Sequence, residues 1–269
     1  MAHILIPTDF SVGSLNACAY ALDLYGGALN TYTLLHSYMD PLPGYAAMVD
    51  MTSVLYAASV EGLAEFSTRF RGLRNGADAL VTTEVVYGPL ATSLPGVCKR
   101  RNIDLIVMGT QGATVGGTLF GSNAGDVAKT SNVPVLIVPK DAKFAGLQHI
   151  LLADDHVRVE PFALRLLVTL AREHGADITI AHVLRNTAEE PDPQVVADYD
   201  ETFLHVPHTY TDALGGDVAQ ALNQVAERDA MDLVAVLHRH TGLLDGLFHG
   251  SVAKRLALQT RIPLLVLEH

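Results

Sequence analysis

The residues best suited to chemistry lie in the stretch MGTQGATVGGTLFGSNAG, which runs from Met108 to Gly125. Glycine has no Cβ, so the backbone at Gly109 and Gly112 can approach a flat ligand or a sugar closely. Free N–H groups at a helix N-terminus favour an anion such as phosphate. Three consecutive residues are predicted to open such a helix: Gly121, Ser122 and Asn123. The stretch therefore predicts a site for a phosphorylated ligand, with an ordinary glycine loop and helix cap as the alternative.

Further candidate residues follow short, mainly apolar runs that are predicted to be strands. Pro7, Thr8 and Asp9 follow the run HILI, and Ser37 follows YTLLH. In a parallel sheet the carboxyl ends of the strands meet at one edge, so these residues are predicted to face the glycine-rich stretch across a crevice. There, Asp9 can accept hydrogen bonds from a base or from a ribose hydroxyl.

Apolar runs alternate with amphipathic segments along the chain, which is the pattern of βαβ units around a buried parallel sheet. In the first half, the predicted strands are Ile4–Pro7, Tyr32–His36, Thr82–Tyr87, Leu105–Met108 and Val133–Val138. The predicted helices between them include Ser14–Tyr25, Leu90–Arg100 and Asn123–Thr130. The predicted fold class is α/β, with two tandem doubly wound, Rossmann-like parallel-sheet domains.

The two domains are indicated by an internal repeat. HILIPTDF, from His3, returns as HILLADDH, from His149, and IDLIVMGT returns as MDLVAVLH. The predicted domains are residues 1–140, which would bind the nucleotide, and residues 148–269, a degenerate copy. The linker lies near PKDAKFAGLQ. The first copy has an additional stretch within PGYAAMVDMTSVLYAASVEGLAEFSTRF, which is predicted to be helical.

The motifs IPTDFS, LLHS, MGTQG, GSNA and VPVLIV resemble the universal stress protein family, in the type of domain that binds ATP. This resemblance implies adenine and ribose contacts at Pro7, Thr8, Asp9, Met108 and Gly109, and a backbone contact at Ser37. It implies ribose and phosphate contacts at Gly112, Gly121, Ser122 and Asn123. The spacer ATVGGTLF has eight residues where the family pattern has nine. The resemblance also implies pairing of the last strands, which gives a homodimer or an intramolecular pseudo-dimer.

The second copy has lost the glycines, since none occurs from Val236 to Thr241. Side chains there fill the space that a ribose needs, which predicts weak or absent nucleotide binding in this half. Histidines gather instead, with acidic neighbours: His156, His182, His238, His240, His249, Asp154 and Asp155. Three or four such ligands can hold Zn²⁺, and scattered polar loop residues are the alternative. A phosphorylation receiver domain is rejected, because Asp232 precedes its predicted strand rather than ending it.

Composition excludes several classes of protein. The formal net charge of −11 argues against a non-specific nucleic-acid binder and against docking on an anionic membrane surface. No apolar run approaches the roughly 18–20 residues that cross a bilayer. Cys18 and Cys98 have no metal-site spacing, so two unreactive free thiols and a cytoplasmic location are expected.

The leading hypothesis is therefore an ATP-binding regulatory protein of the stress-response type, which binds the nucleotide with or without Mg²⁺. Known ATP-using motifs such as the Walker sequence are absent. No Lys or Arg lies between Gly109 and Ser122 to neutralise a transferring phosphoryl group, so at most slow ATP hydrolysis is expected. The alternative is an interaction scaffold that binds no nucleotide, with a histidine-rich metal site in its second half.

Overall fold

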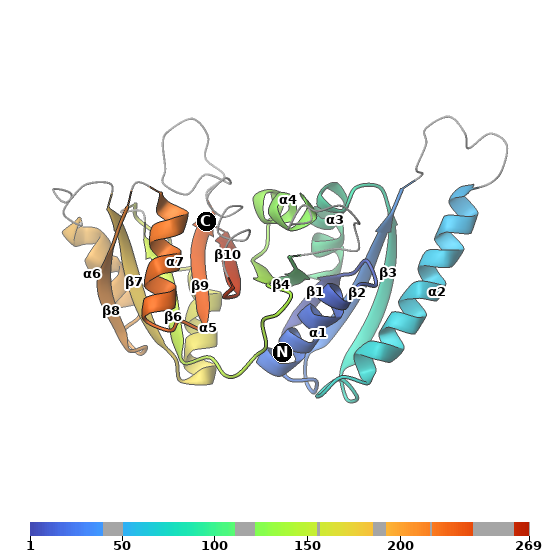
Figure 1. Ribbon diagram of the computed structural model, residues 1–269, viewed down its shortest axis with the longest axis horizontal. Helices are drawn as coiled ribbons and strands as arrows, with labels where there is room; N and C mark the ends of the chain where they lie inside the picture. Colours follow the sequence, from blue (N-terminus) through green and yellow to red (C-terminus); the bar gives the residue numbers. More distant parts are fainter. Residues whose placement is uncertain are drawn as a thin grey trace. The chain divides into compact units, whose positions relative to one another are not determined.

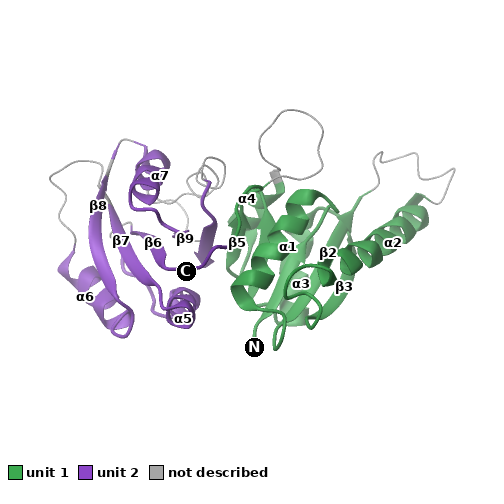
Figure 2. Cartoon of the chain, turned by 60° about the horizontal axis from the view of Figure 1, so that its bottom comes forward, with its two compact units in different colours: residues 1–143 green, residues 144–269 purple. Residues whose placement is uncertain are grey.

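The computed structural model of the chain describes residues 1–39, 51–110, 122–154, 157–184, 192–215, 217–238 and 261–268. The chain divides into two compact units, Met1–Lys143 and Phe144–His269 (Figure 2). Each unit holds a parallel sheet with helices around it, which confirms the predicted α/β class. Within these ranges, no helix is long and apolar enough to cross a membrane.

The sheet of the first unit has five parallel strands in the order β3-β2-β1-β4-β5 (Figure 1). They are β1 (His3–Pro7), β2 (Thr31–Tyr38), β3 (Leu80–Tyr87), β4 (Leu105–Gly109) and β5 (Val135–Val138). The central strands are buried on both faces, as their continuous apolar runs predict. The strand order reverses between β1 and β4, and this reversal is the point at which doubly wound sheets open a crevice for ligands.

Helices cover both faces of this sheet. They are α1 (Val12–Tyr25), α2 (Met51–Arg71), α3 (Leu90–Arg101) and α4 (Ser122–Thr130). Right-handed crossovers put α1 and α2 on one face and α3 and α4 on the other, and each pair packs together. The predicted helices are confirmed at these positions, and the additional helical stretch of the first copy is part of α2 rather than a separate element.

The second unit repeats the arrangement, with strand order β8-β7-β6-β9-β10. Its strands are β6 (His149–Asp154), β7 (Asp177–Leu184), β8 (His208–Leu214), β9 (Leu233–His238) and β10 (Leu264–Glu268). Its described helices are α5 (Arg165–His174), α6 (Pro193–Thr202) and α7 (Val218–Arg228). The helix that corresponds to α2 is α6, which has 10 residues where α2 has 21.

The repeat extends to a hydrogen-bonded clamp at the amino edge of each sheet. The backbone N–H of His3 donates to Asp104 Oδ2 at 2.8 Å, and the N–H of Asp104 donates to the His3 carbonyl at 2.9 Å. His149 and Asp232 form the same two bonds at 3.0 and 2.8 Å. Asp232 thus holds the start of β9 in place at the amino edge of the sheet. A receiver domain carries its acceptor aspartate at the opposite, carboxyl edge.

Candidate functional site

The candidate site of the first unit lies at the carboxyl ends of β1 and β4. Ile4 pairs with Leu105 and Leu5 pairs with Ile106, so the residues that follow these strands leave the sheet side by side. The structure thereby brings together five predicted site residues at one edge: Pro7, Thr8, Asp9, Met108 and Gly109. Ser37 lies on the next strand, two residues beyond Leu35, which pairs with Pro7.

The turn that carries Asp9 is fixed by hydrogen bonds from several elements. The N–H of Thr8 donates to the Leu35 carbonyl at 2.8 Å, which extends the pairing of β1 with β2 by one residue. Thr8 is buried, and its Oγ1 accepts from the Phe10 N–H at 2.9 Å. Asp9 Oδ1 accepts from the Ser11 N–H at 3.2 Å, and Ser11 caps α1. The backbone around Asp9 is therefore held in place before any ligand arrives.

Two residues of this turn region were not among the predicted site residues. His36 Nδ1 donates to the Thr8 carbonyl at 2.8 Å, and the His36 ring stacks on Phe10 with a centroid distance of 4.4 Å. The internal repeat aligns His36 with His182, and this alignment was the sequence signal for a role of His36. Nothing in the sequence pointed to Phe10.

Gly109 has a packing role that differs from the one suggested by the sequence. A Cβ at this position would lie 2.9 Å from the Gly13 carbonyl oxygen and 3.1 Å from the Gly13 carbonyl carbon. These atoms belong to the backbone of α1 and cannot rotate away. The close approach of α1 to β4 is therefore sufficient reason for glycine at this position.

The predicted phosphate-binding residues are described only in part. Gly112 and Gly121 lie outside the described residues. Ser122 begins α4, as predicted, and Asn123 is exposed in its first turn. The N-terminus of α4 thus follows β4 along the chain, where the helix dipole favours an anion.

At the corresponding edge of the second unit, three side chains form a buried polar network. Asp154 ends β6, aligns with Thr8 and is fully buried. Its carboxylate accepts from His182 Nδ1 at 2.7 Å and from the Tyr199 hydroxyl at 2.9 Å. Both donors are themselves buried. A buried carboxylate needs such partners, because an unpaired charge in the interior is strongly unfavourable.

The network continues through aromatic contacts to the surface. The Tyr210 ring lies parallel to the His182 ring at 5.4 Å, and its hydroxyl donates to Asp200 Oδ1 at 2.6 Å. This hydrogen bond, together with one from His208, lowers the pKa of Asp200. Burial lowers the pKa of His208, but hydrogen bonds to the Val206 carbonyl and to Asp200 outweigh burial, so the pKa of His208 is raised.

The zinc site that was one of the two alternatives for this half is not assembled by its described candidates. Asp154 and His182 pair across β6 and β7 and so share one face of the sheet. Leu152 pairs with Ala235, which places Asp154 level with Leu237 and puts His238 on the opposite face. The remaining candidates lie outside the described residues: Asp155, His156, His240 and His249. Across the described ranges, no three His, Cys, Asp or Glu residues are grouped so as to hold a metal ion.

The second unit also differs at the position of Gly109. The aligned motifs IDLIVMG and MDLVAVL place Leu237 there, with its side chain buried. In the first unit, α1 begins at Val12, immediately after the Asp9 turn, whereas α5 begins only at Arg165. A leucine at this position excludes the close helix–strand contact that Gly109 allows. Among the described residues, the helix that follows the first strand of the second unit thus starts further along the chain from that strand than α1 does from β1.

Comparisons with known proteins agree with the repeated architecture. The profile of the universal stress protein family matches the chain twice, over residues 1–139 and 146–268. A universal stress protein from Methanocaldococcus jannaschii is 30% identical over 142 residues, which cover 52% of this chain and 83% of that protein.

Two solved structures share the fold over nearly the whole chain. A universal stress protein from Archaeoglobus fulgidus gives a TM-score of 0.75 at 18% identity, covering 99% of this chain and 98% of that one. A protein of unknown function from Pseudomonas aeruginosa gives 0.56 at 13% identity, covering 100% and 92%.

Proposed function

Since the chain belongs to the universal stress protein family, with one copy of the family pattern in each half, we propose that it is a regulatory protein whose first unit binds ATP. The observation that carries the proposal is the reversal of strand order between β1 and β4. The Asp9 turn and the strand end at Gly109 adjoin at that point, and the chain then leads to the N-terminus of α4. An acidic hydrogen-bond acceptor and a helix N-terminus suit the two ends of a nucleotide.

Within this proposal, the residues divide by the part of ATP that they contact. Five lie at the ends of β1 and β4 and would contact adenine and ribose: Pro7, Thr8, Asp9, Met108 and Gly109. Ser37 would contribute its backbone. The four residues from the glycine-rich stretch would contact ribose and phosphates, with or without Mg²⁺: Gly112, Gly121, Ser122 and Asn123.

We further propose that the second unit binds no nucleotide. Its buried Asp154 already accepts hydrogen bonds from His182 and Tyr199, whereas Thr8, at the aligned position, is hydrogen-bonded to the Phe10 N–H and the Ser14 hydroxyl. Leu237 replaces the glycine that allows α1 to approach β4, and α5 starts later after its strand than α1 does. ATP would then regulate the protein through one half, by favouring whichever conformation binds it more tightly.

Titration calorimetry of the full chain with ATP tests the proposal. We expect the wild type to bind ATP, and we expect Asp9→Asn to weaken binding about tenfold or more, the loss of one hydrogen bond to a charged group. Asn keeps an oxygen for the Ser11 N–H, so the turn is preserved. Asp23→Asn is the matched control, because Asp23 lies near the C-terminal end of α1, at the amino edge of the sheet.

Two further measurements separate the alternatives. Repeating the titration with ADP, AMP and adenosine measures how much the phosphates contribute. Phosphate release by wild type and Asp9→Asn tests for slow hydrolysis, and turnover that survives this substitution would place the activity elsewhere. No heat with any nucleotide would reject the proposal in favour of an interaction scaffold.

A further inference from the structure

We propose that Gly62 of α2 is a positioning residue for the Asp9 turn, through its contact with Phe10. The inference rests on the proposed function in so far as Asp9 contacts the nucleotide. Gly62 lies far from Asp9 in the sequence and on a different element. Its role is to leave space for the Phe10 ring. It sets the affinity of the site without touching the ligand.

The first observation is the space beside Gly62. A Cβ on Gly62 would lie 2.8 Å from both Cε2 and Cζ of the Phe10 ring, well inside van der Waals contact. The ring has little freedom to retreat, because His36 stacks on it at 4.4 Å and Phe66 lies at 6.1 Å. Any side chain at position 62 therefore pushes on Phe10.

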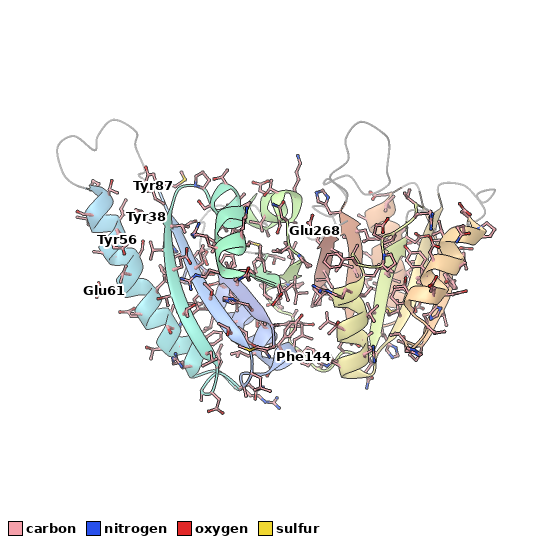
Figure 3. The ribbon with its side chains drawn as sticks, turned by 180° about the vertical axis from the view of Figure 1, so that it is seen from behind. Tyr38, Tyr56, Glu61, Tyr87, Phe144 and Glu268 are labelled. Carbon is pink, nitrogen blue, oxygen red and sulfur yellow. The ribbon has the colours of Figure 1, made fainter. Side chains whose placement is uncertain are left out.

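The second observation is that α2 is held against the sheet on both sides of Gly62. Towards its N-terminus, Tyr56 contacts Tyr38 at a centroid distance of 6.3 Å (Figure 3). Towards its C-terminus, Phe70 contacts Tyr32 at 5.3 Å. Because both contacts join α2 to β2, the helix does not simply move away when Gly62 gains a side chain. The Phe10 ring is displaced instead.

The third observation is the backbone of Phe10, which has a φ of 65°. This left-handed conformation is strained for a bulky residue and persists only where the surroundings enforce it. Here, the Phe10 N–H donates to Thr8 Oγ1 at 2.9 Å, and Arg69 of α2 donates to the Phe10 carbonyl at 3.3 Å. Displacement of the ring shifts the backbone of this strained residue, which directly follows Asp9 in the sequence.

The test uses the full chain and four variants, one of which is Phe10→Leu alone as the baseline for the double variant. Gly62→Ala adds the Cβ. Gly96→Ala is the matched control, since Gly96 is also inside a helix but its Cβ would meet only Arg100 Nη1, at 3.4 Å. Both substitutions raise helix propensity, so neither is expected to unfold the protein. Gly62→Ala with Phe10→Leu removes the two ring atoms that collide and is expected to restore the turn.

Two readouts are compared: hydrogen exchange of the Phe10 and Ser11 amides by NMR without nucleotide, and the dissociation constant for ATP. We expect Gly62→Ala to speed exchange at both amides and to weaken ATP binding, each about tenfold. Gly96→Ala should change neither. In the double variant, both quantities should return to the values of Phe10→Leu alone.

The inference is overturned if Gly62→Ala leaves exchange unchanged, if Gly96→Ala has the same effect, or if exchange rises without any loss of ATP affinity. It is also overturned if Phe10→Leu gives no rescue. Absence of ATP binding by the wild type would reject the proposed function and, with it, the role of Gly62 in affinity. The exchange measurement would still decide whether Gly62 positions the turn.

Discussion

Replacing Asp154 by alanine removes the acceptor of two buried donors, the His182 Nδ1–H and the Tyr199 hydroxyl. Hydrogen bonds to a carboxylate contribute about 1.5–3 kcal/mol each, so the loss of both is expected to cost about 3–6 kcal/mol. A domain is stable by only about 5–15 kcal/mol, so Asp154→Ala is expected to remove a large part of the stability of the second unit.

Two further variants resolve this loss into its parts. Tyr199→Phe deletes one hydrogen bond and should cost about 1.5–3 kcal/mol. Made in the Asp154→Ala background, the same change should cost much less, because its partner is already gone. Asp141→Ala is the control, since Asp141 is exposed and paired only weakly with Lys140 at 4.0 Å, and it should stay within about 0.5 kcal/mol of wild type.

The assay is urea unfolding followed by circular dichroism, with hydrogen exchange of β6 and β7 peptides to localise the change to the second unit. A loss below about 1 kcal/mol for Asp154→Ala, or additive effects of Asp154→Ala and Tyr199→Phe, would refute the buried network as a source of stability.

Three further predictions follow from single contacts. Gly109→Ala should cost about 1–3 kcal/mol, because its Cβ meets the α1 backbone, and unchanged stability in urea would contradict that packing. The raised pKa of His208 stabilises the fold below the unfolded value of about 6.5, and this contribution is lost as the pH rises through the folded pKa. As the pH rises from about 6 to about 8, the melting temperature of His208→Asn should therefore fall less than that of wild type. Parallel curves of melting temperature against pH would reject this contribution of His208. Burial raises the pKa of Cys98 to about 11 and also raises that of Cys18, so thiol reagents should modify both only after unfolding, and rapid native labelling would contradict their burial.

Much of the fold follows from local patterns in the sequence. The residues Ile4–Ile6 are all apolar because helices cover both faces of β1, and the similar run after His149 predicts the second sheet. It could also be predicted that Asp9 and Gly109 lie at the same edge of the sheet, since parallel strands present their carboxyl ends at one edge.

Contacts between distant elements could not be predicted in this way. Gly62 looks like an ordinary helix glycine until Phe10 is placed beside it, and Tyr199 gives no sign that it donates to Asp154. The reason for Gly109 likewise depends on how closely α1 approaches β4. Such contacts depend on the three-dimensional packing of side chains, which has no period along the chain.

We propose that one of the two similar units binds ATP, and native mass spectrometry of the intact chain counts the bound nucleotides directly. We expect one ATP per chain for wild type, one for Asp23→Asn and a clear loss of occupancy for Asp9→Asn. Two ATP molecules per chain, none, or one that survives Asp9→Asn unchanged would contradict it.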